Sequence, residues 1–366
     1  SSILNAHQHF ALPALAPLAL DIGYVVGLYL FVPTLGIHGL AWGTVVGGVL
    51  HVLIQVPALV RYRITYRPAL ALRMAGVAEI VRLMGPRIVT LGTIQIADLF
   101  IIRFASALPT GSTAAYFYGY SLMQLPQTLF GTAIALVMFP TMAEYFNAGN
   151  IAAMKRTAVN ALGIIWTLTI PAAVLLVLLG QPAIAFLLEG GAFTAESTRL
   201  VYSVLLVFSV RIVSESTLEI VARLFYAQHN TRTPLFAYLG WLAVNVGVAY
   251  LAVDGLGIVG LALASTVAFT VLAAVLFVLN RRVLGSLRER ELAISAGRAL
   301  LAAAGMGLTV WLLGTQINTR FLYLAVGGMA GVFSYSSLNL LLGGRELPAL
   351  FKLLRQRTAV DTPTAP

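Results

Sequence analysis

The segment Leu35-Gly36-Ile37-His38-Gly39-Leu40-Ala41 recurs as Leu256-Gly257-Ile258-Val259-Gly260-Leu261-Ala262, with one residue changed. The two copies are 221 residues apart, and the same spacing relates Pro13 to Pro234 and Arg61 to Arg282. A match that keeps one register over this length indicates an internal repeat. Each copy lies between two long apolar runs, so the repeat predicts two equivalent helix pairs with the same orientation.

The composition around these segments indicates a membrane protein. Hydrophobic residues make up 59% of the 366-residue chain, charged residues make up 10%, and the mean hydropathy is +0.91. Soluble domains carry about 25% charged residues. The chain has no cysteine, which excludes disulfides and thiolate metal sites, and its five histidines form no metal-ligand pattern. We therefore expect an all-α, polytopic membrane protein.

Apolar runs long enough to cross a bilayer, about 20 residues each, occur ten times. We expect membrane helices near 11–31, 37–60, 80–107, 113–142, 157–180, 198–225, 234–252, 257–279, 292–313 and 321–342.

The loops between these runs alternate in charge. Of the 23 basic residues, 19 lie on one side of the predicted membrane, and Arg199 and Arg320 are the basic residues of the other side. By the positive-inside rule the rich side is cytoplasmic, and both ends of the chain lie there. The net charge of +10 is thus a topology signal rather than a sign of nucleic-acid binding.

The repeat also predicts the domain organisation. Residues 1–62 form the last two helices of an N-lobe, 63–283 form a six-helix C-lobe, 284–345 form two additional helices, and 346–366 form a cytoplasmic tail. The lobes are related about the membrane normal. Because the second lobe has six helices, roughly four helices are expected to precede residue 1, which gives a fold of about fourteen helices and an N-terminally truncated chain.

A row of four charged residues lies inside the predicted helix 198–225: Arg211, Glu215, Glu219 and Arg223. Residues four apart share one helix face, so the row forms one stripe that rises about 18 Å. An ionised group in lipid costs at least about 2.5 kcal/mol. The row is therefore either two internal ion pairs or one wall of a polar transport path, and we favour the path.

Asp98 and Arg103 lie in the predicted helix 80–107, five residues apart and so on different faces. Asp98 is a candidate for a cavity-facing residue, whereas snorkelling toward the nearby loop at 108–111 is sufficient to explain Arg103. Tyr116, Tyr118 and Tyr120 begin the next helix, where an interfacial aromatic belt is the main interpretation and contact with a sugar is the alternative.

Enzyme signatures are missing from the sequence: there is no Walker loop, no metalloprotease pair and no nucleophile elbow. We expect a protein that is not an enzyme and has no cofactor. Catalysis by the charged row is a remote alternative.

Four motifs follow one another along the chain. They are Ile3-Leu4-Asn5-Ala6 with Phe10, Pro13 and Pro17; Leu125-Pro126 with Gly131, Ala133 and Pro140; Gly191-Ala192-Phe193-Thr194; and Phe225-Tyr226-Ala227 through Thr231-Arg232-Thr233-Pro234. Together, in this order, they resemble the MurJ/MviN family of lipid II flippases.

The resemblance implies a monomeric flippase of the multidrug/oligosaccharidyl-lipid/polysaccharide exporter superfamily in the bacterial cytoplasmic membrane. Its partners would be a lipid-linked cell-wall precursor and membrane lipid, and it would work by alternating access. The membrane potential or a coupling ion would drive the cycle. The helices at 292–313 and 321–342 resemble the pair that forms a groove for the lipid tail.

Two positions depart from the family pattern. An Asp-Arg pair, whose arginine is thought to hold the pyrophosphate, is typical where this chain has Tyr120 and Ser121, and a basic residue is common at Glu219. We expect Arg211, Arg223 and Arg103 to compensate as substrate contacts, together with Ser121, while Glu215, Glu219 and Asp98 set pairing or ion coupling.

Two other functions remain open at this stage. One is a cation-coupled multidrug or polysaccharide-lipid exporter of the same superfamily. The other is a non-transporting scaffold for envelope synthesis, which would have no need of a buried charged row.

Overall fold

The computed structural model describes residues 4, 11–61, 75–344, 346 and 348, without the side chains of 11, 13, 14, 75–83, 86 and 87. Apart from residues 346 and 348, the predicted tail at 346–366 lies outside the described residues, as does most of the first family motif. Contacts divide the chain into two compact units, Ser1–Ala78 and Glu79–Pro366. The lobe boundaries expected from the repeat stay predictions.

The first unit is a pair of apolar helical segments. The first segment comprises α2 (Ala11–Val26), the π-helix η1 (Gly27–Phe31) and α3 (Val32–Leu35), and the second comprises α4 (His38–Leu53) and α5 (Val56–Arg61). Glycines let the two segments approach closely. A Cβ atom added to Gly43 would lie 2.7 Å from the Cα atom of Gly27, so no larger residue fits at this contact.

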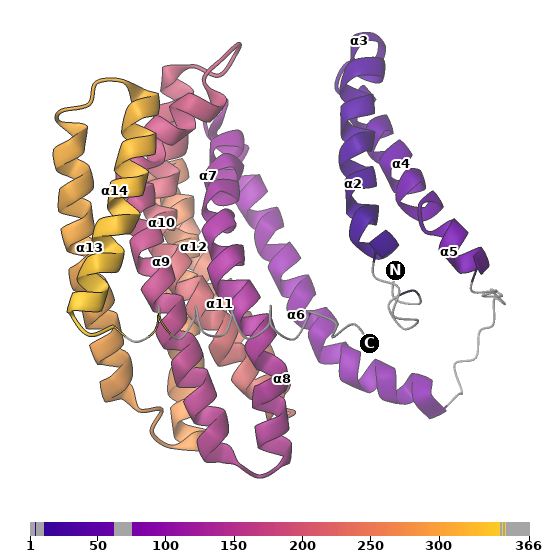
Figure 1. Cartoon of the computed structure of the whole chain (residues 1–366). Coiled ribbons are helices and arrows are strands. Elements are labelled where there is room, and N and C mark those ends of the chain that lie inside the picture. Colours follow the sequence, from indigo (N-terminus) through magenta and orange to yellow (C-terminus); the bar gives the residue numbers. More distant parts are fainter. Residues whose placement is uncertain (1–3, 5–10, 62–74, 345, 347, 349–366) are drawn as a thin grey trace, which may run out of the picture. The chain divides into compact units, whose positions relative to one another are not determined.

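The second unit is a helical bundle (Figure 1). Its elements are α6 (Ala75–Ala105), α7 (Ser112–Pro126), the π-helix η2 (Gln127–Thr132), α8 (Ala133–Asn147), α9 (Ile151–Leu188), α10 (Ala195–Ala227), α11 (Arg232–Leu256), α12 (Ile258–Leu284), α13 (Glu289–Gly314) and α14 (Arg320–Leu341).

These helices confirm the all-α membrane fold. Nine helices among the described residues are long and apolar enough to cross a membrane. The one predicted span not among these nine is 198–225. It corresponds to α10, which is helical over 33 residues, about 50 Å. The predicted span 113–142 is one continuous helical segment that runs through η2, and η2 begins directly after Pro126.

The turn at the repeated segment has the same backbone in both copies. Gly36 has φ 56° and ψ −140°, and Gly257 has φ 55° and ψ −132°, a region that residues with a Cβ atom rarely adopt. Three residues later, a Cβ atom at Gly39 would lie 2.5 Å from the carbonyl carbon of Phe31, and one at Gly260 would lie 2.7 Å from that of Ala252. Since these partners are also 221 residues apart, the repeat is a repeat of structure.

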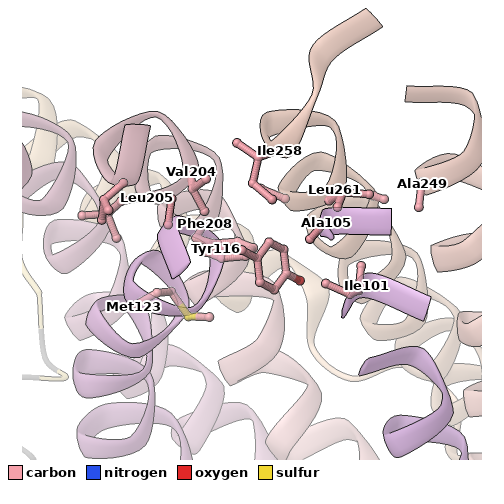
Figure 2. Close-up of a cluster of buried hydrophobic side chains, with 14 of the residues drawn as sticks. Ile101, Ala105, Tyr116, Met123, Val204, Leu205, Phe208, Ala249, Ile258 and Leu261 are labelled. Carbon is pink, nitrogen blue, oxygen red and sulfur yellow. The ribbon is translucent and has the colours of Figure 1, made fainter. Parts of the chain in front are cut away.

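Within the second unit, α9 and α10 form the centre of the bundle. In the N-terminal half of α10, Phe208 packs edge to face against Tyr116 of α7 and belongs to a buried cluster with Ile101 of α6 and Leu261 of α12 (Figure 2). Tyr116 is 6% exposed, so it belongs to the core and not to the expected aromatic belt. The core thus packs α10 against α7 and α12.

The two C-terminal helices pack on each other and on α9 (Figure 1). Glycines in α14 make these contacts tight: a Cβ atom at Gly331 would lie 3.0 Å from the side chain of Val310 and 3.1 Å from that of Leu175. Tyr335 donates a 2.5 Å hydrogen bond to the backbone carbonyl of Thr167 in α9. The small residues of this pair therefore serve helix–helix packing.

Candidate transport site on α10

The four charged side chains of α10 form two ion pairs within the helix. The Nε atom of Arg211 lies 2.8 Å from Oε2 of Glu215, and Arg223 pairs with the carboxylate of Glu219. Arg223 also donates a 2.8 Å hydrogen bond to the backbone carbonyl of Glu219. The helical spacing of four residues places each acid one turn from its base. The internal pairing considered from the sequence is therefore present.

The Arg211 guanidinium is enclosed by groups from three helices. Its Nη1 atom donates a 2.7 Å hydrogen bond to the hydroxyl of Ser265 in α12. The guanidinium carbon lies 4.1 Å from the ring centre of Phe269, 5.1 Å from that of Tyr120 and 5.3 Å from that of Phe208. Arg211 is 4% exposed. The hydrogen bonds and the faces of aromatic rings compensate its charge, and they join α7, α10 and α12.

The other ion pair is more open. The side chains of Glu219 and Arg223 are 25% and 17% exposed, against 13% and 5% for Glu215 and Arg211. The hydroxyl of Thr132 in η2 donates a 3.3 Å hydrogen bond to Oε1 of Glu219. Of the two arginines in the row, Arg223 is therefore the one more accessible to a ligand.

The remaining predicted site residues lie outside the α10 row, on α6 and α7. Asp98 is exposed on α6 and lies close enough to Arg211 for their charges to interact. Arg103 and Ser121 are also exposed, and within the described residues neither side chain forms an ion pair or a hydrogen bond; the backbone carbonyl of Arg103 accepts one from the Ser106 hydroxyl. Asp98 is therefore within electrostatic range of Arg211, but among the described residues no hydrogen bond or ion pair joins any of these three predicted site residues to the Arg211 cluster.

Nothing in the sequence indicates that Arg211 is enclosed. Ser265 and Phe269 lie in an apolar run of α12 that carries no charge, and Thr132 lies in a π-helical segment. A serine and a phenylalanine four residues apart share one helix face, but nothing in their pattern shows that this face meets Arg211.

A second charged cluster lies beyond the end of α9, outside the spans. Glu189 accepts a 2.7 Å hydrogen bond from Arg320 and a 2.9 Å hydrogen bond from the hydroxyl of Thr198. These two bonds, the one from Arg320 foremost, hold the pKa of Glu189 below its usual value. Because Arg320 begins α14, this pair ties the C-terminal helices to the turn between α9 and α10.

Comparison with known proteins gives one consistent family. The family model described as "Lipid II flippase MurJ" matches residues 1–327. The chain is 30% identical to the probable lipid II flippase MurJ of Bdellovibrio bacteriovorus, over 94% of this chain and 67% of that protein. It is 29% identical to the probable lipid II flippase MurJ of Haemophilus influenzae, over 87% of this chain and 64% of the relative. The chain thus spans about two thirds of the length of these curated relatives.

Solved structures show the same architecture. A lipid II flippase MurJ in an inward closed conformation aligns with a TM-score of 0.76 at 22% identity, over 92% of this chain and 68% of that one. An inward-facing multidrug transporter of the MATE family aligns with a TM-score of 0.60 at 17% identity, over 74% and 64%. These two likenesses concern the fold. The family match over residues 1–327, with the helical membrane fold, shows that this chain is a multi-pass membrane protein of the MurJ family of lipid II flippases.

Proposed function

We propose that the protein moves a lipid-linked peptidoglycan precursor of the lipid II type across the cytoplasmic membrane by alternating access. The observation that carries this proposal is the family match over residues 1–327, which includes the whole charged row of α10. The positive-inside pattern supports an orientation with both chain ends in the cytoplasm. The working unit is a monomer, and the membrane potential or a coupling ion drives the cycle.

The geometry of the row supports a division of labour between its two pairs. Lipid II carries its headgroup on a diphosphate, and a guanidinium binds phosphate oxygens in a fork of two hydrogen bonds. Arg223 is the better placed for this contact, because it is more exposed than Arg211 and its partner Glu219 has a second partner in Thr132. The diphosphate would take the place of the Glu219 carboxylate.

Arg211 has a different role in this proposal. Its donors are directed at Glu215 and Ser265 and its faces at aromatic rings, so it holds α7, α10 and α12 together beside the cargo path. Asp98 adds a carboxylate next to this cluster, where a coupling ion would interact with it. Arg103 and Ser121, both exposed, supply further contacts to the headgroup.

The lipid tail is expected to follow the C-terminal pair. The surface of α13 and α14 exposes large apolar side chains, with Leu301, Trp311 and Phe333 each more than half exposed. Such a surface suits an acyl or polyprenyl chain. Neighbouring side chains of the protein fill the space beside the glycines between the helices. We therefore place the lipid tail on this outer surface.

The test compares Arg223→Gln with Arg232→Gln in the full chain. Arg232 is an exposed arginine at the start of α11 and serves as the matched control. Loss of a charged hydrogen bond costs about 1.5–3 kcal/mol, which corresponds to roughly 10- to 150-fold weaker binding. We expect Arg223→Gln to lose lipid II binding and flipping in proteoliposomes by such a factor, and Arg232→Gln to keep both. Equal flipping by both variants at equal protein levels would contradict the assignment of Arg223.

A further inference from the structure

A cavity lies far from the charged row, near the N-terminal end of α10. It has a volume of about 270 Å³ and lies between the first turns of α7 and α10, about 40 Å along α10 from Arg223. Its polar and aromatic lining comprises Thr110, Tyr118, Phe193, Thr194, Glu196 and Ser197. The positive-inside pattern places this end of the bundle on the outer side of the membrane.

Tyr118 provides an aromatic wall of this cavity. The core residue Tyr116 and the Arg211 neighbour Tyr120 lie two residues away on either side, so they occupy the opposite face of α7. The Tyr118 ring is 44% exposed and meets Phe193 edge to face, with centroids 5.8 Å apart and an interplanar angle of 87°. Phe193 thus fixes the orientation of a ring that still has free surface.

The hydroxyl groups of Thr194 and Ser197 leave one hydrogen-bond donor unused. Thr194 and Ser197 form a capping box in which each side-chain oxygen accepts a hydrogen bond from the other residue's backbone N–H. Capping therefore uses an acceptor site on each oxygen. The two hydroxyl oxygens also lie 3.4 Å apart, where one donates to the other. A hydroxyl has one donor and two acceptor sites, so the pair keeps one donor for an oxygen in the cavity.

Glu196 gives the cavity its charge. It is exposed in the first turn of α10, where a carboxylate is favoured by the helix dipole, and no ion pair engages it among the described residues. A carboxylate at the wall disfavours an anionic ligand and accepts hydrogen bonds from hydroxyl groups. Capping alone explains Thr194 and Ser197, but it explains neither the cavity nor the exposed ring of Tyr118.

We infer that this cavity is a binding site for a single neutral sugar ring. The ring would stack its C–H face on Tyr118, and its hydroxyls would bond to Glu196, Thr194 and Ser197. The volume lies just below the range of about 300–1,000 Å³ typical of drug-sized ligands, which suits one sugar ring and not a whole headgroup. The inference rests on the proposed function, in which the sugar belongs to the headgroup that leaves on the outer side.

The test measures binding of N-acetylglucosamine to the purified full chain in nanodiscs, by saturation-transfer NMR. Tyr118→Ala is compared with Tyr145→Ala, a 37% exposed tyrosine of α8 that does not line the cavity. Truncation of a central aromatic contact costs about 1–2 kcal/mol, so we expect binding roughly 5- to 30-fold weaker in Tyr118→Ala and unchanged in Tyr145→Ala. Absence of binding to the wild type, or equal binding by both variants, would overturn the inference and leave Tyr118 as an interfacial aromatic.

The charge of the cavity gives a second readout that does not depend on stability. Wild-type protein is expected to bind N-acetylglucosamine in preference to glucuronate, and Glu196→Gln is expected to reduce this preference by admitting the anion. Equal binding of both sugars by the wild type would also overturn the inference. Sugar binding without any flipping of lipid II would refute the proposed function alone, and Arg223-dependent flipping without sugar binding would refute the cavity assignment alone.

Discussion

Replacing Arg211 by methionine tests whether its guanidinium is part of the framework of the bundle. The change removes the 2.8 Å ion pair with Glu215 and the 2.7 Å hydrogen bond to Ser265, and it leaves a carboxylate that is 13% exposed. Removing one partner of a buried pair costs about 3–5 kcal/mol, because the remaining charge is uncompensated. The partial exposure of Glu215 favours the lower end, so we expect a loss of about 3 kcal/mol.

The double variant Arg211→Met/Glu215→Leu separates the stranded charge from the lost packing. With both charges gone, the remaining cost is the lost hydrogen bond to Ser265, about 0.5–1.5 kcal/mol. Equilibrium unfolding in SDS-containing mixed micelles, followed by tryptophan fluorescence, measures all three proteins, with Arg232→Met as the exposed control. The reasoning is refuted if Arg211→Met is no less stable than the double variant, because Glu215 would then not depend on Arg211.

Two further predictions concern the turns. Gly257→Ala, at φ 55°, is expected to destabilise the protein by about 1–3 kcal/mol, whereas Gly255→Ala, in open helical space, is expected to be neutral or slightly stabilising in the same unfolding assay. The Glu189–Arg320 pair is expected to weaken in acid. The pKa of Glu189 is lowered in the folded state. Its ionised carboxylate therefore stabilises the folded protein fully at pH values above the usual glutamate pKa of about 4.3, and this stabilisation is lost as the pH falls through the lowered pKa. Amide exchange at the start of α14 should therefore rise at low pH, and Arg320→Gln should raise it already at neutral pH; a pH-independent wild type would contradict this.

Much of the fold could be predicted from the sequence because lipid imposes a simple length rule. Each of the ten apolar runs is helical, and the ends differ by a few residues. The largest difference is at α9, which extends over Ile151–Leu188, beyond the predicted 157–180 at both ends. The turn conformation shared by Gly36 and Gly257 was also accessible, since an identical local sequence in one register favours an identical local structure.

The site was less predictable, because its geometry depends on contacts between helices. The pairing of Arg211 with Glu215 follows from their spacing, whereas the contact of Arg211 with Ser265 joins residues 54 apart in the sequence. Tyr120 shows the same limit. The sequence shows only that Tyr120 stands where the family typically has a charged residue. The structure shows that its ring lies beside Arg211. Side-chain periodicity indicates which face a residue occupies but not which helix that face meets.

The central claim is that this protein moves a lipid-linked precursor between leaflets. The most direct measurement places the purified full chain in liposomes with fluorescent lipid II in both leaflets, and follows how much of the lipid an external quencher can reach over time. The account predicts that the protected pool is exposed at a rate proportional to the amount of protein, and that Arg223→Gln slows this rate while Arg232→Gln does not. A protected pool that stays constant with wild-type protein, with or without a membrane potential or an ion gradient, would contradict it.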